Sequence, residues 1–466
     1  MRVALSLIAG LGLTVAASLV APHAEACGGC FPPPGEQNSV VTDHRMILSV
    51  SKAQTTLYDQ IQYQGSPSEF AWVLPISGTV DVGLSADSLF SALHNLSAVT
   101  VLEPPRNCPP PPQCNNDEGD SFSAGASADA SAGAPPQVDV LKREVVGPYE
   151  TVQLKSEDAG ALEKWLADNG FNVPEDIKPV IGQYVAEKFN FLALRLRPGQ
   201  GVQSMRPVRV TTQGASAVLP LRMVAAGTGA NVGITLWVIG EGRYEPQNFQ
   251  SFVIKNDDLV WDWNTGSSNY KDLRAQRSAD QPGKMWEIES SNPTFRQQIE
   301  NAVRFGVFTP GRPQPDPGGD YLPVEDENGA ITKTADTVRD EDLATVFAGI
   351  APGQEHLTRM RSDLSRAALA TDLTVIASND QSSIPTQRNP KGEIGQPLCP
   401  VFDGDCRQTG TLPRDQAAAR AAEADGTFAC QTGVSHSNLG GAGAISAFLA
   451  LAVMRAARDR RRARRT

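Results

Sequence analysis

The stretch Val40-Val-Thr-Asp-His-Arg-Met-Ile-Leu-Ser-Val-Ser51 alternates apolar and polar side chains and is rich in β-branched residues. A period of two is typical of a β-strand with one buried face. Residues 55–63 and 70–76 repeat the pattern, and the turn-forming run Gly65-Ser66-Pro67 separates them. The three segments together predict a β-meander near the start of the folded region.

Strand and helix patterns continue to about residue 380. Leu89, Phe90 and Leu93 recur at helical spacing behind Ser85, a candidate N-cap, and Ser156 stands in the same place before a second helix. We predict helices over residues 86–96, 156–168, 177–189, 293–305, 340–350 and 356–370. We predict strands over residues 138–154, 191–197, 208–212, 217–224, 233–239 and 373–377. This order favours an α+β fold, an antiparallel-rich sheet with helical inserts.

Composition divides the chain into regions. With 466 residues it is long enough for one large or two ordinary domains. Residues 27–380 carry the α+β pattern, interrupted at 104–137 by a run rich in Pro, Ser, Ala and Gly. That run has too little apolar surface to offset its ordering entropy, so we predict a disordered insertion. Residues 381–438 are predicted to be a linker that contains a short Ala-rich helix.

The first 26 residues have the pattern of a cleaved secretory signal peptide. One early cation, Arg2, precedes an apolar run, and Ala24-Glu25-Ala26 forms an A-x-A cleavage site ahead of Cys27. Cleavage there makes Cys27 the first mature residue, which raises the alternative of a lipoprotein. The charged Glu25 stands where a lipobox has a small residue, and this counts against lipidation.

Residues 439–457 are predicted to form one C-terminal transmembrane helix. The apolar part, residues 439–454, would rise ~24 Å, slightly less than a ~30 Å hydrocarbon core, and Arg455 and Arg458 can snorkel to the headgroups. Residues 458–466 form an Arg-rich tail that the positive-inside rule places in the cytoplasm. We therefore predict an exported protein of the cell envelope, anchored in the membrane with its main domain extracytoplasmic.

The C-terminal tail also resembles the sorting domain of many myxobacterial surface proteins. The matching features are Cys430, the run Gly440-Gly-Ala-Gly443, the apolar helix after it, and Arg460-Arg-Arg462. The resemblance implies removal of the helix, modification of Cys430 as an anchor, and transfer to the outer surface. Because the spacer after Cys430 is longer than that pattern has, retention of the helix is the alternative.

The seven cysteines of an exported chain indicate disulfides first. Six lie close together in sequence as three pairs: Cys27 with Cys30, Cys108 with Cys114, and Cys399 with Cys406. We predict three local bridges that pin loops, with Cys430 left over. The alternative for Cys27-Gly-Gly-Cys30 is a redox or metal site, which the Pro-rich run after it disfavours because that run opposes a helix.

The sequence contains no familiar catalytic motif. A Gly-x-Ser-x-Gly elbow, a His-Glu-x-x-His pair and a phosphate-binding Gly-rich loop are all missing, so no catalytic residue, metal ligand or cofactor is nominated. Asp43-His44-Arg45 is the most suggestive cluster, although Asp43 and His44 would point to opposite faces of a strand. Trp261 and Trp263 share a strand face on which a sugar ring can stack, and a half-buried core face is the alternative.

Several runs resemble an uncharacterised bacterial family known as domain of unknown function 2330. They are Cys27-Gly-Gly-Cys-Phe31, Val41-Thr-Asp-His-Arg-Met46, Thr56-Leu-Tyr-Asp-Gln-Ile61, Phe70-Ala-Trp-Val-Leu-Pro75, Leu357-Thr-Arg-Met360 and Asp372-Leu373. The resemblance covers roughly residues 27–380. It implies an exported or membrane-anchored protein and supplies no catalytic residue.

Charge also narrows the function. The formal net charge is −11 although seven of the last twelve residues are Arg, so the region before the tail is more acidic than the whole chain. Such a region repels phosphate backbones and disfavours nucleic-acid binding. We predict a non-enzymatic envelope module that binds or scaffolds an envelope protein or a glycan. The alternatives are an extracytoplasmic hydrolase of unrecognised type and a glycan-binding module.

Overall fold

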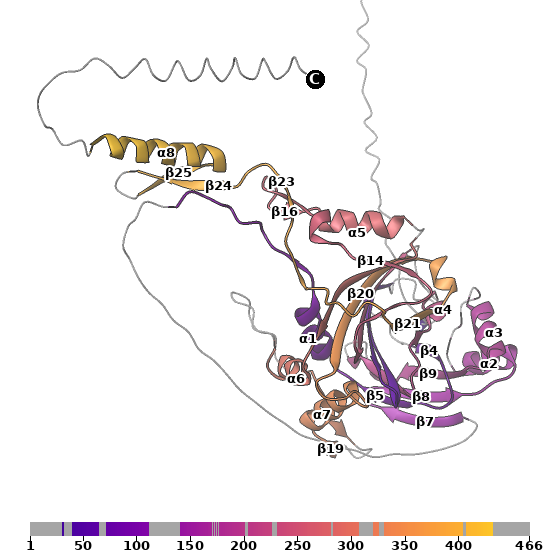
Figure 1. Cartoon of the computed structure of the whole chain (residues 1–466). Helices are drawn as coiled ribbons and strands as arrows, with labels where there is room; N and C mark the ends of the chain where they lie inside the picture. The colour runs from indigo at the N-terminus through magenta and orange to yellow at the C-terminus, as the bar shows by residue number, and fades with distance from the viewer. Residues whose placement is uncertain are drawn as a thin grey trace, which may run out of the picture. The chain divides into compact units, whose positions relative to one another are not determined.

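The structure, a computed structural model, describes residues 30–31, 40–64, 71–110, 140–169, 171, 173, 175, 177–200, 204–225, 231–280, 283–306, 320–325, 330–403 and 407–431 (Figure 1). The chain divides into two compact units. The first contains residues up to 104 and 119–395, and the second contains residues 105–118 and those from 396 onward.

An eight-stranded mixed sheet forms the centre of the first unit. Its order is β14 (Gln250–Phe252), β17 (Met285–Pro293), β20 (Glu355–Ser365), β12 (Asn231–Glu241), β2 (Val40–Val50), β3 (Gln54–Gln64), β10 (Val208–Gln213) and β5 (Asp81–Leu84). The pairs β14–β17 and β12–β2 are parallel and the other pairs are antiparallel. This confirms the α+β class with an antiparallel-rich sheet.

Both faces of the large sheet are buried. Because neighbouring residues of a strand point to opposite faces, Leu236 packs on one side of β12 and Trp237 on the other. The Leu236 face is covered by α4 (Leu221–Val224) and by β11 (Val218–Leu219) and β21 (Leu373–Ala377). The Trp237 face is covered by α1 (Asp87–Ser97), α6 (Arg296–Phe305) and α7 (Ala335–Val346) (Figure 1). The result is a layered core with a helical layer over the face that positions the site below.

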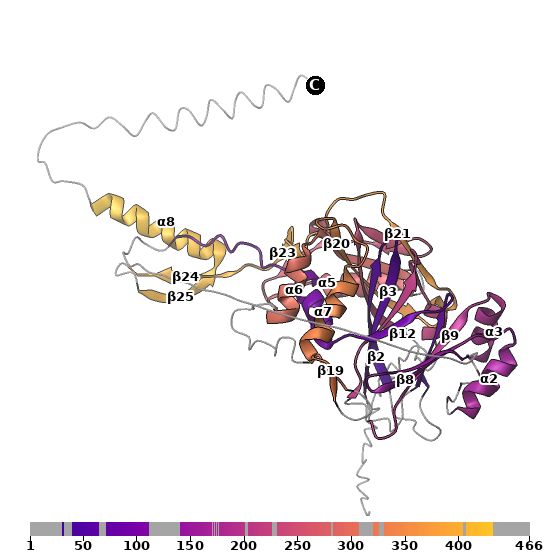
Figure 2. The same ribbon diagram turned by 90° about the horizontal axis from the view of Figure 1, so that it is seen from below.

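A second, antiparallel sheet of five strands lies beside it. Its order is β1 (Cys30–Phe31), β4 (Ala71–Ile76), β9 (Asn190–Leu196), β8 (Tyr149–Leu154) and β7 (Val140–Val146). The helices α2 (Ala159–Asp168) and α3 (Lys178–Ala186) cover one of its faces (Figures 1 and 2). The predicted meander is therefore wrong at its third strand, because β4 pairs with β9 and not with β3.

Short elements complete the first unit. A three-stranded sheet joins β16 (Ser267–Ser268), β15 (Val260–Asp262) and β23 (Gly392–Ile394), and α5 (Tyr270–Ala279) packs on β17. The remaining strands are β6 (Thr100–Val101), β13 (Tyr244–Pro246), β18 (Val324–Glu325), β19 (Ile331–Lys333) and β22 (Gln387–Arg388).

The largest correction to the sequence-based elements concerns residues 356–370. They were expected to form a helix, and most of them form β20, which pairs with β17 on one side and β12 on the other. Charged residues within β20, such as Arg359 and Arg361, break the simple apolar alternation that would have indicated a strand. Two cap predictions also fail: Ser85 Oγ donates to Asp342 Oδ2, and Asp158 takes the expected place of Ser156 as N-cap of α2.

The second unit is a hairpin with a helix. The strands β24 (Leu398–Phe402) and β25 (Gln408–Pro413) pair, and α8 (Arg414–Gln431) packs on them around Val401 and Ala417. These elements occupy much of the interval 381–438 that was expected to be a linker, and α8 contains the predicted Ala-rich helix.

The disulfide of this unit joins Cys108 to Cys399, 291 residues apart in sequence, with an S–S distance of 2.07 Å. The predicted local pairs Cys108 with Cys114 and Cys399 with Cys406 are therefore wrong. The pairing follows from the fold, because Cys399 lies in β24 and the segment before residue 110 runs beside it, with Cys108 packed on that small core.

Several predicted segments lie outside the described residues. They are the signal peptide 1–26, the greater part of the insertion 104–137, the helix 439–457 and the tail 458–466, together with Cys27, Cys114, Cys406 and the side chains of Cys30 and Cys430. Within the portion of the chain that the structure describes, no helix combines the length and apolarity needed to cross a membrane.

Candidate functional site

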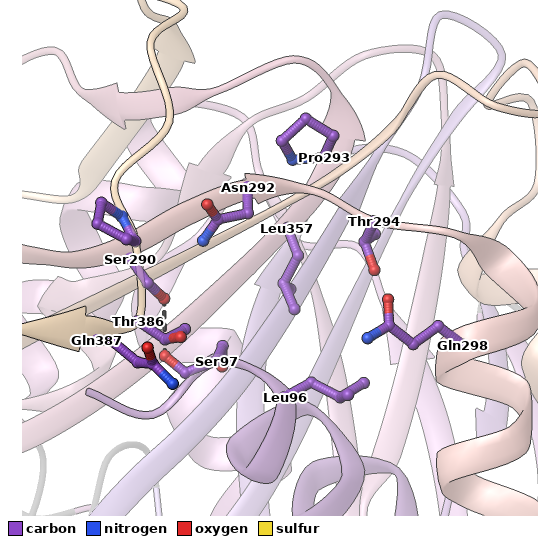
Figure 3. Close-up of a pocket in the computed structure, with 11 residues that line it drawn as sticks. Leu96, Ser97, Ser290, Asn292, Pro293, Thr294, Gln298, Leu357, Thr386 and Gln387 are labelled. Carbon is purple, nitrogen blue, oxygen red and sulfur yellow. Dashed lines mark hydrogen bonds between the residues drawn. The ribbon is translucent and has the colours of Figure 1, made fainter. Parts of the chain in front are cut away.

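A pocket of about 270 Å³ opens in the first unit beside the last turn of α1. Its other walls are the second half of β17, Leu357 of β20, the first turn of α6 and the segment 385–387 (Figure 3). Its lining residues are Leu96, Ser97, Ser290, Asn292, Pro293, Thr294, Gln298, Leu357, Pro385, Thr386 and Gln387. None of them is ionisable.

A β-bulge in β17 directs the side chains of Ser290 and Asn292 toward the pocket. The register against β20 shifts between Ile288 and Ser290, and this places Ser290 on the face that α1 covers. Ser290 Oγ donates to the carbonyl oxygen of Ser97 at 2.7 Å (Figure 3), and Ser97 Oγ accepts from Trp237 Nε1 at 2.8 Å. The inner wall of the pocket is therefore fixed to the sheet and to α1.

Arg388 holds the opposite wall in place. This buried side chain donates from Nη2 to the backbone oxygen of Glu289 at 2.7 Å and from Nε to that of Ile254 at 2.9 Å. Its Nη1 donates to the carbonyl oxygen of Pro385. One guanidinium thus ties the segment that carries Thr386 and Gln387 to β17.

The outer polar groups of the pocket retain hydrogen-bonding capacity. Asn292 Nδ2 donates to the carbonyl oxygen of Ile384 at 2.9 Å, and its Oδ1 accepts no hydrogen bond from a described residue. Among the residues that the structure describes, the side chains of Thr294, Gln298 and Gln387 make no hydrogen bond. Figure 3 shows Asn292, Gln298 and Gln387 on different sides of the space, with Leu96 and Leu357 between them.

Buried charged side chains of β17 and β20 lie next to the pocket. Arg359 Nε donates to Glu289 Oε2, and both side chains are almost completely buried. Tyr270 OH donates to Glu287 Oε1 at 2.6 Å, and burial raises the pKa of Glu287 to about 7. Arg359 Nη1 also lies 3.2 Å from His94 Nδ1, and burial together with nearby guanidinium groups lowers the pKa of His94 to about 4. His94 is thus a neutral acceptor for Arg359.

One serine–histidine pair has the spacing of a nucleophile and its base. Ser291 Oγ lies 2.8 Å from His356 Nε2 and 2.8 Å from Thr358 Oγ1. Ser291 is completely buried and its side chain does not line the pocket, because it points to the other face of β17 from Ser290 and Asn292. Burial, followed by the charge of Arg243, lowers the pKa of His356. As it stands, the pair has no space for a substrate.

Within the cluster Asp43-His44-Arg45, the structure places His44 and Arg45 on opposite faces of β2. His44 is completely buried, and its Nδ1 lies 3.4 Å from Asp59 Oδ1. Arg45 points to the other face, where Nη1 donates to Gln60 Oε1 at 3.0 Å and the guanidinium lies 5.3 Å from the ring centroid of Trp237. The side chain of Asp43 lies outside the described residues.

Trp261 and Trp263 do lie together, but as an edge-to-face pair. Their ring centroids are 6.2 Å apart and their planes are inclined by 71°. Trp261 is 8% exposed, and Trp263 Nε1 donates to Glu393 Oε2 at 2.7 Å. The two indoles therefore do not form one flat platform for a sugar ring.

No pattern in the sequence predicts the pocket. Its polar residues are neutral Ser, Thr, Asn and Gln, which are common on any surface and form no motif at a fixed spacing. A weak signal was available in the run Ser290-Ser-Asn-Pro-Thr294, a polar end on an apolar strand. In the described part of the chain, no group of three or more His, Cys, Asp or Glu residues is placed to hold a metal ion.

Comparison with known proteins shows the family of the chain. No curated protein is significantly similar to it. A mutated baculovirus P35 after caspase cleavage is similar at 10% identity over 44% of this chain and 69% of that chain, with a TM-score of 0.25. Baculovirus P35 itself has 11% identity over 44% and 66%, with a TM-score of 0.24; scores this low do not show a shared fold. The model of the family described as uncharacterized protein conserved in bacteria, DUF2330, matches residues 21–375, so this chain belongs to the DUF2330 family.

Proposed function

We propose that this protein is a non-enzymatic binding module of the cell envelope and that the pocket beside α1 is its binding site. The observation that supports this most directly is the lining, in which neutral hydrogen-bonding side chains surround Leu96 and Leu357 and none is ionisable. Acid–base chemistry needs a titratable group within hydrogen-bond reach of the reacting atoms. A pocket lined in this way is suited to holding an uncharged ligand.

Two features of the sequence support an envelope location. The signal-peptide pattern of residues 1–26 directs export, and the helix 439–457 with the basic tail 458–466 would hold the protein at its C-terminus. In the sorting alternative, Cys430 replaces the helix as the anchor and the protein reaches the outer surface. The intact mass of the protein recovered from its native envelope distinguishes the two, because a species that retains residues 460–466 excludes removal of the tail.

The binding proposal is tested by native mass spectrometry of the full chain after incubation with the low-molecular-weight fraction of an envelope extract. We expect a ligand adduct on the wild type. Gln387→Trp should abolish it, because Gln387 is an exposed residue at the edge of the pocket and a large ring there would fill the opening. Asn389→Trp is the matched control, since Asn389 is also exposed and does not line the pocket. Equal adduct on both variants and the wild type would refute the proposal.

A hydrolase is the second candidate, because Ser291 on β17 and His356 on β20 lie at hydrogen-bonding distance. It requires β17 to open, since Ser291 is completely buried. The ligand recovered from the full chain decides between the two functions. Recovery of the ligand unchanged supports binding, whereas conversion that Ser291→Ala abolishes would make the protein an enzyme.

A further inference from the structure

We propose that the ligand of the pocket is an uncharged sugar residue. This inference rests on the proposed binding function and names the class of ligand. It follows from three properties of the pocket: the kind of hydrogen-bonding groups, the apolar surface between them, and the absence of charge among the residues that line it.

The polar groups of the pocket suit the hydroxyl groups of a ligand better than ligand groups that only donate or only accept hydrogen bonds. The amides of Asn292, Gln298 and Gln387 each offer an acceptor and a donor, and the hydroxyl of Thr294 does both. A sugar hydroxyl also donates and accepts. Because these amides stand on different sides of the space, a ring that carries several hydroxyls can reach more than one of them (Figure 3).

The apolar surface and the size of the pocket suit one ring. Leu96, Leu357 and Pro293 supply a non-polar area on which the C–H face of a pyranose can lie. The volume of about 270 Å³ is slightly below the ~300–1,000 Å³ of pockets that take drug-sized ligands. One sugar residue, alone or at the end of a chain, fits this space.

The lining and the strand pairing disfavour the other ligand classes. A carboxylate or phosphate would lose hydration without gaining a charged partner from the lining. One common mode of peptide binding adds a strand to an open sheet edge, and β17 has no open edge at the pocket. Ser291 exchanges backbone hydrogen bonds with Ile384 at 2.9 and 2.8 Å, and β20 pairs along the other side.

The test uses the full chain and a panel of uncharged hexoses, N-acetylhexosamines and their methyl glycosides. D-glucuronate represents charged sugars, and N-acetylalanine methylamide represents the peptide backbone. Saturation-transfer NMR detects weak binding, and calorimetry gives the Kd. The variants are Gln298→Ala, which removes a pocket amide, and Gln297→Ala, which removes an exposed amide from the same turn of α6 outside the pocket.

We expect at least one uncharged sugar to bind, with Gln298→Ala weakening it about fivefold, the equivalent of ~1 kcal/mol for one hydrogen bond. Gln297→Ala should leave the Kd within about twofold. Binding of glucuronate or the methylamide in place of uncharged sugars, weakened by Gln298→Ala, would overturn the sugar assignment and leave the binding proposal standing. No binding of any probe to a chain that still forms the native adduct would also overturn the sugar assignment. Equal adduct on the wild type, Gln387→Trp and Asn389→Trp would overturn both the sugar assignment and the binding proposal.

Discussion

Replacing Glu287 with Gln is expected to stabilise the fold above neutral pH, because the change removes a carboxylate from a buried position. Glu287 lies on β17 and is 1% exposed. Burial, followed by the charge of Glu289, raises its pKa, which is about 7 in the folded protein. The hydrogen bond from Tyr270, together with Arg274 and Arg388, opposes the rise. In the described structure Glu287 Oε2 has no hydrogen-bond partner that would favour the charged form.

The magnitude follows from the difference between the ordinary pKa of 4.5 and the value of about 7 in the folded protein. At 1.36 kcal/mol for each tenfold change in proton affinity, this corresponds to about 3 kcal/mol. The folded state binds the proton more tightly than the unfolded state does. The stabilising contribution is therefore complete below pH 4.5 and is lost as the pH rises through about 7.

The assay is urea unfolding of the full chain and of Glu287→Gln between pH 4 and pH 8.5. Other titrating groups affect both proteins, so the difference between their unfolding free energies isolates Glu287. We expect this difference to rise by about 3 kcal/mol in favour of the variant across the interval, most steeply between pH 5 and 7. The hydrogen bond from Tyr270 is kept, because the Gln carbonyl accepts it.

A difference that stays constant with pH would refute the reasoning, since it would mean that Glu287 ionises alike in the folded and unfolded chains. Tyr270→Phe provides an independent check. It removes the hydrogen bond that favours the carboxylate, so the pH at which the wild-type stabilisation disappears should move upward. A downward movement would contradict the assignment of the contact.

The other predictions concern pairing and burial. Peptide mapping without reduction should give a Cys108–Cys399 crosslink. Breaking this disulfide should destabilise the β24–β25 unit by up to ~5 kcal/mol, the loop-entropy value for so long a closure. A crosslink from Cys108 to another cysteine would contradict the fold of this unit. Asp342→Asn should lower the free energy of unfolding by ~3–5 kcal/mol in urea titrations, because Arg209 loses its buried counter-charge. Arg209 Nη1 lies 2.7 Å from Asp342 Oδ1. A loss below ~1 kcal/mol would show that solvent reaches this pair. Ser291→Ala should lower the unfolding free energy by ~1–2 kcal/mol and leave ligand binding unchanged in native mass spectra; lost binding would place Ser291 in the site.

Local patterns predicted several elements whose residues repeat with the period of a helix or a strand. The helix α1 was foreseen from Leu89, Phe90 and Leu93, and all three are buried against the sheet. The strands β2 and β3 were foreseen in the same way, and they pair along their length. In these segments each residue's environment is set by the period of the element itself, which a single sequence displays.

The features that local patterns do not predict depend on contacts between residues far apart in the sequence. The strand β20 lies between two others and is buried on both faces, with Arg359 neutralised by Glu289 on a neighbouring strand. The disulfide joins cysteines that only the fold brings together. The strands that pair with β20 and the two cysteines of the disulfide are far apart in sequence, so local spacing could not indicate either pairing. The same holds for the pocket, whose walls come from α1, β17, β20, α6 and the segment 385–387.

Hydrogen–deuterium exchange of the full chain, with and without the ligand fraction that forms the adduct, tests most directly whether this pocket is the binding site. We expect slower exchange in peptides that contain residues 96–97, 290–298 and 385–387, which line the pocket. Exchange near Trp263 should not change. Protection around Trp263 with unchanged exchange in the pocket walls would show that the pocket is not the binding site and would move the site to the indole pair.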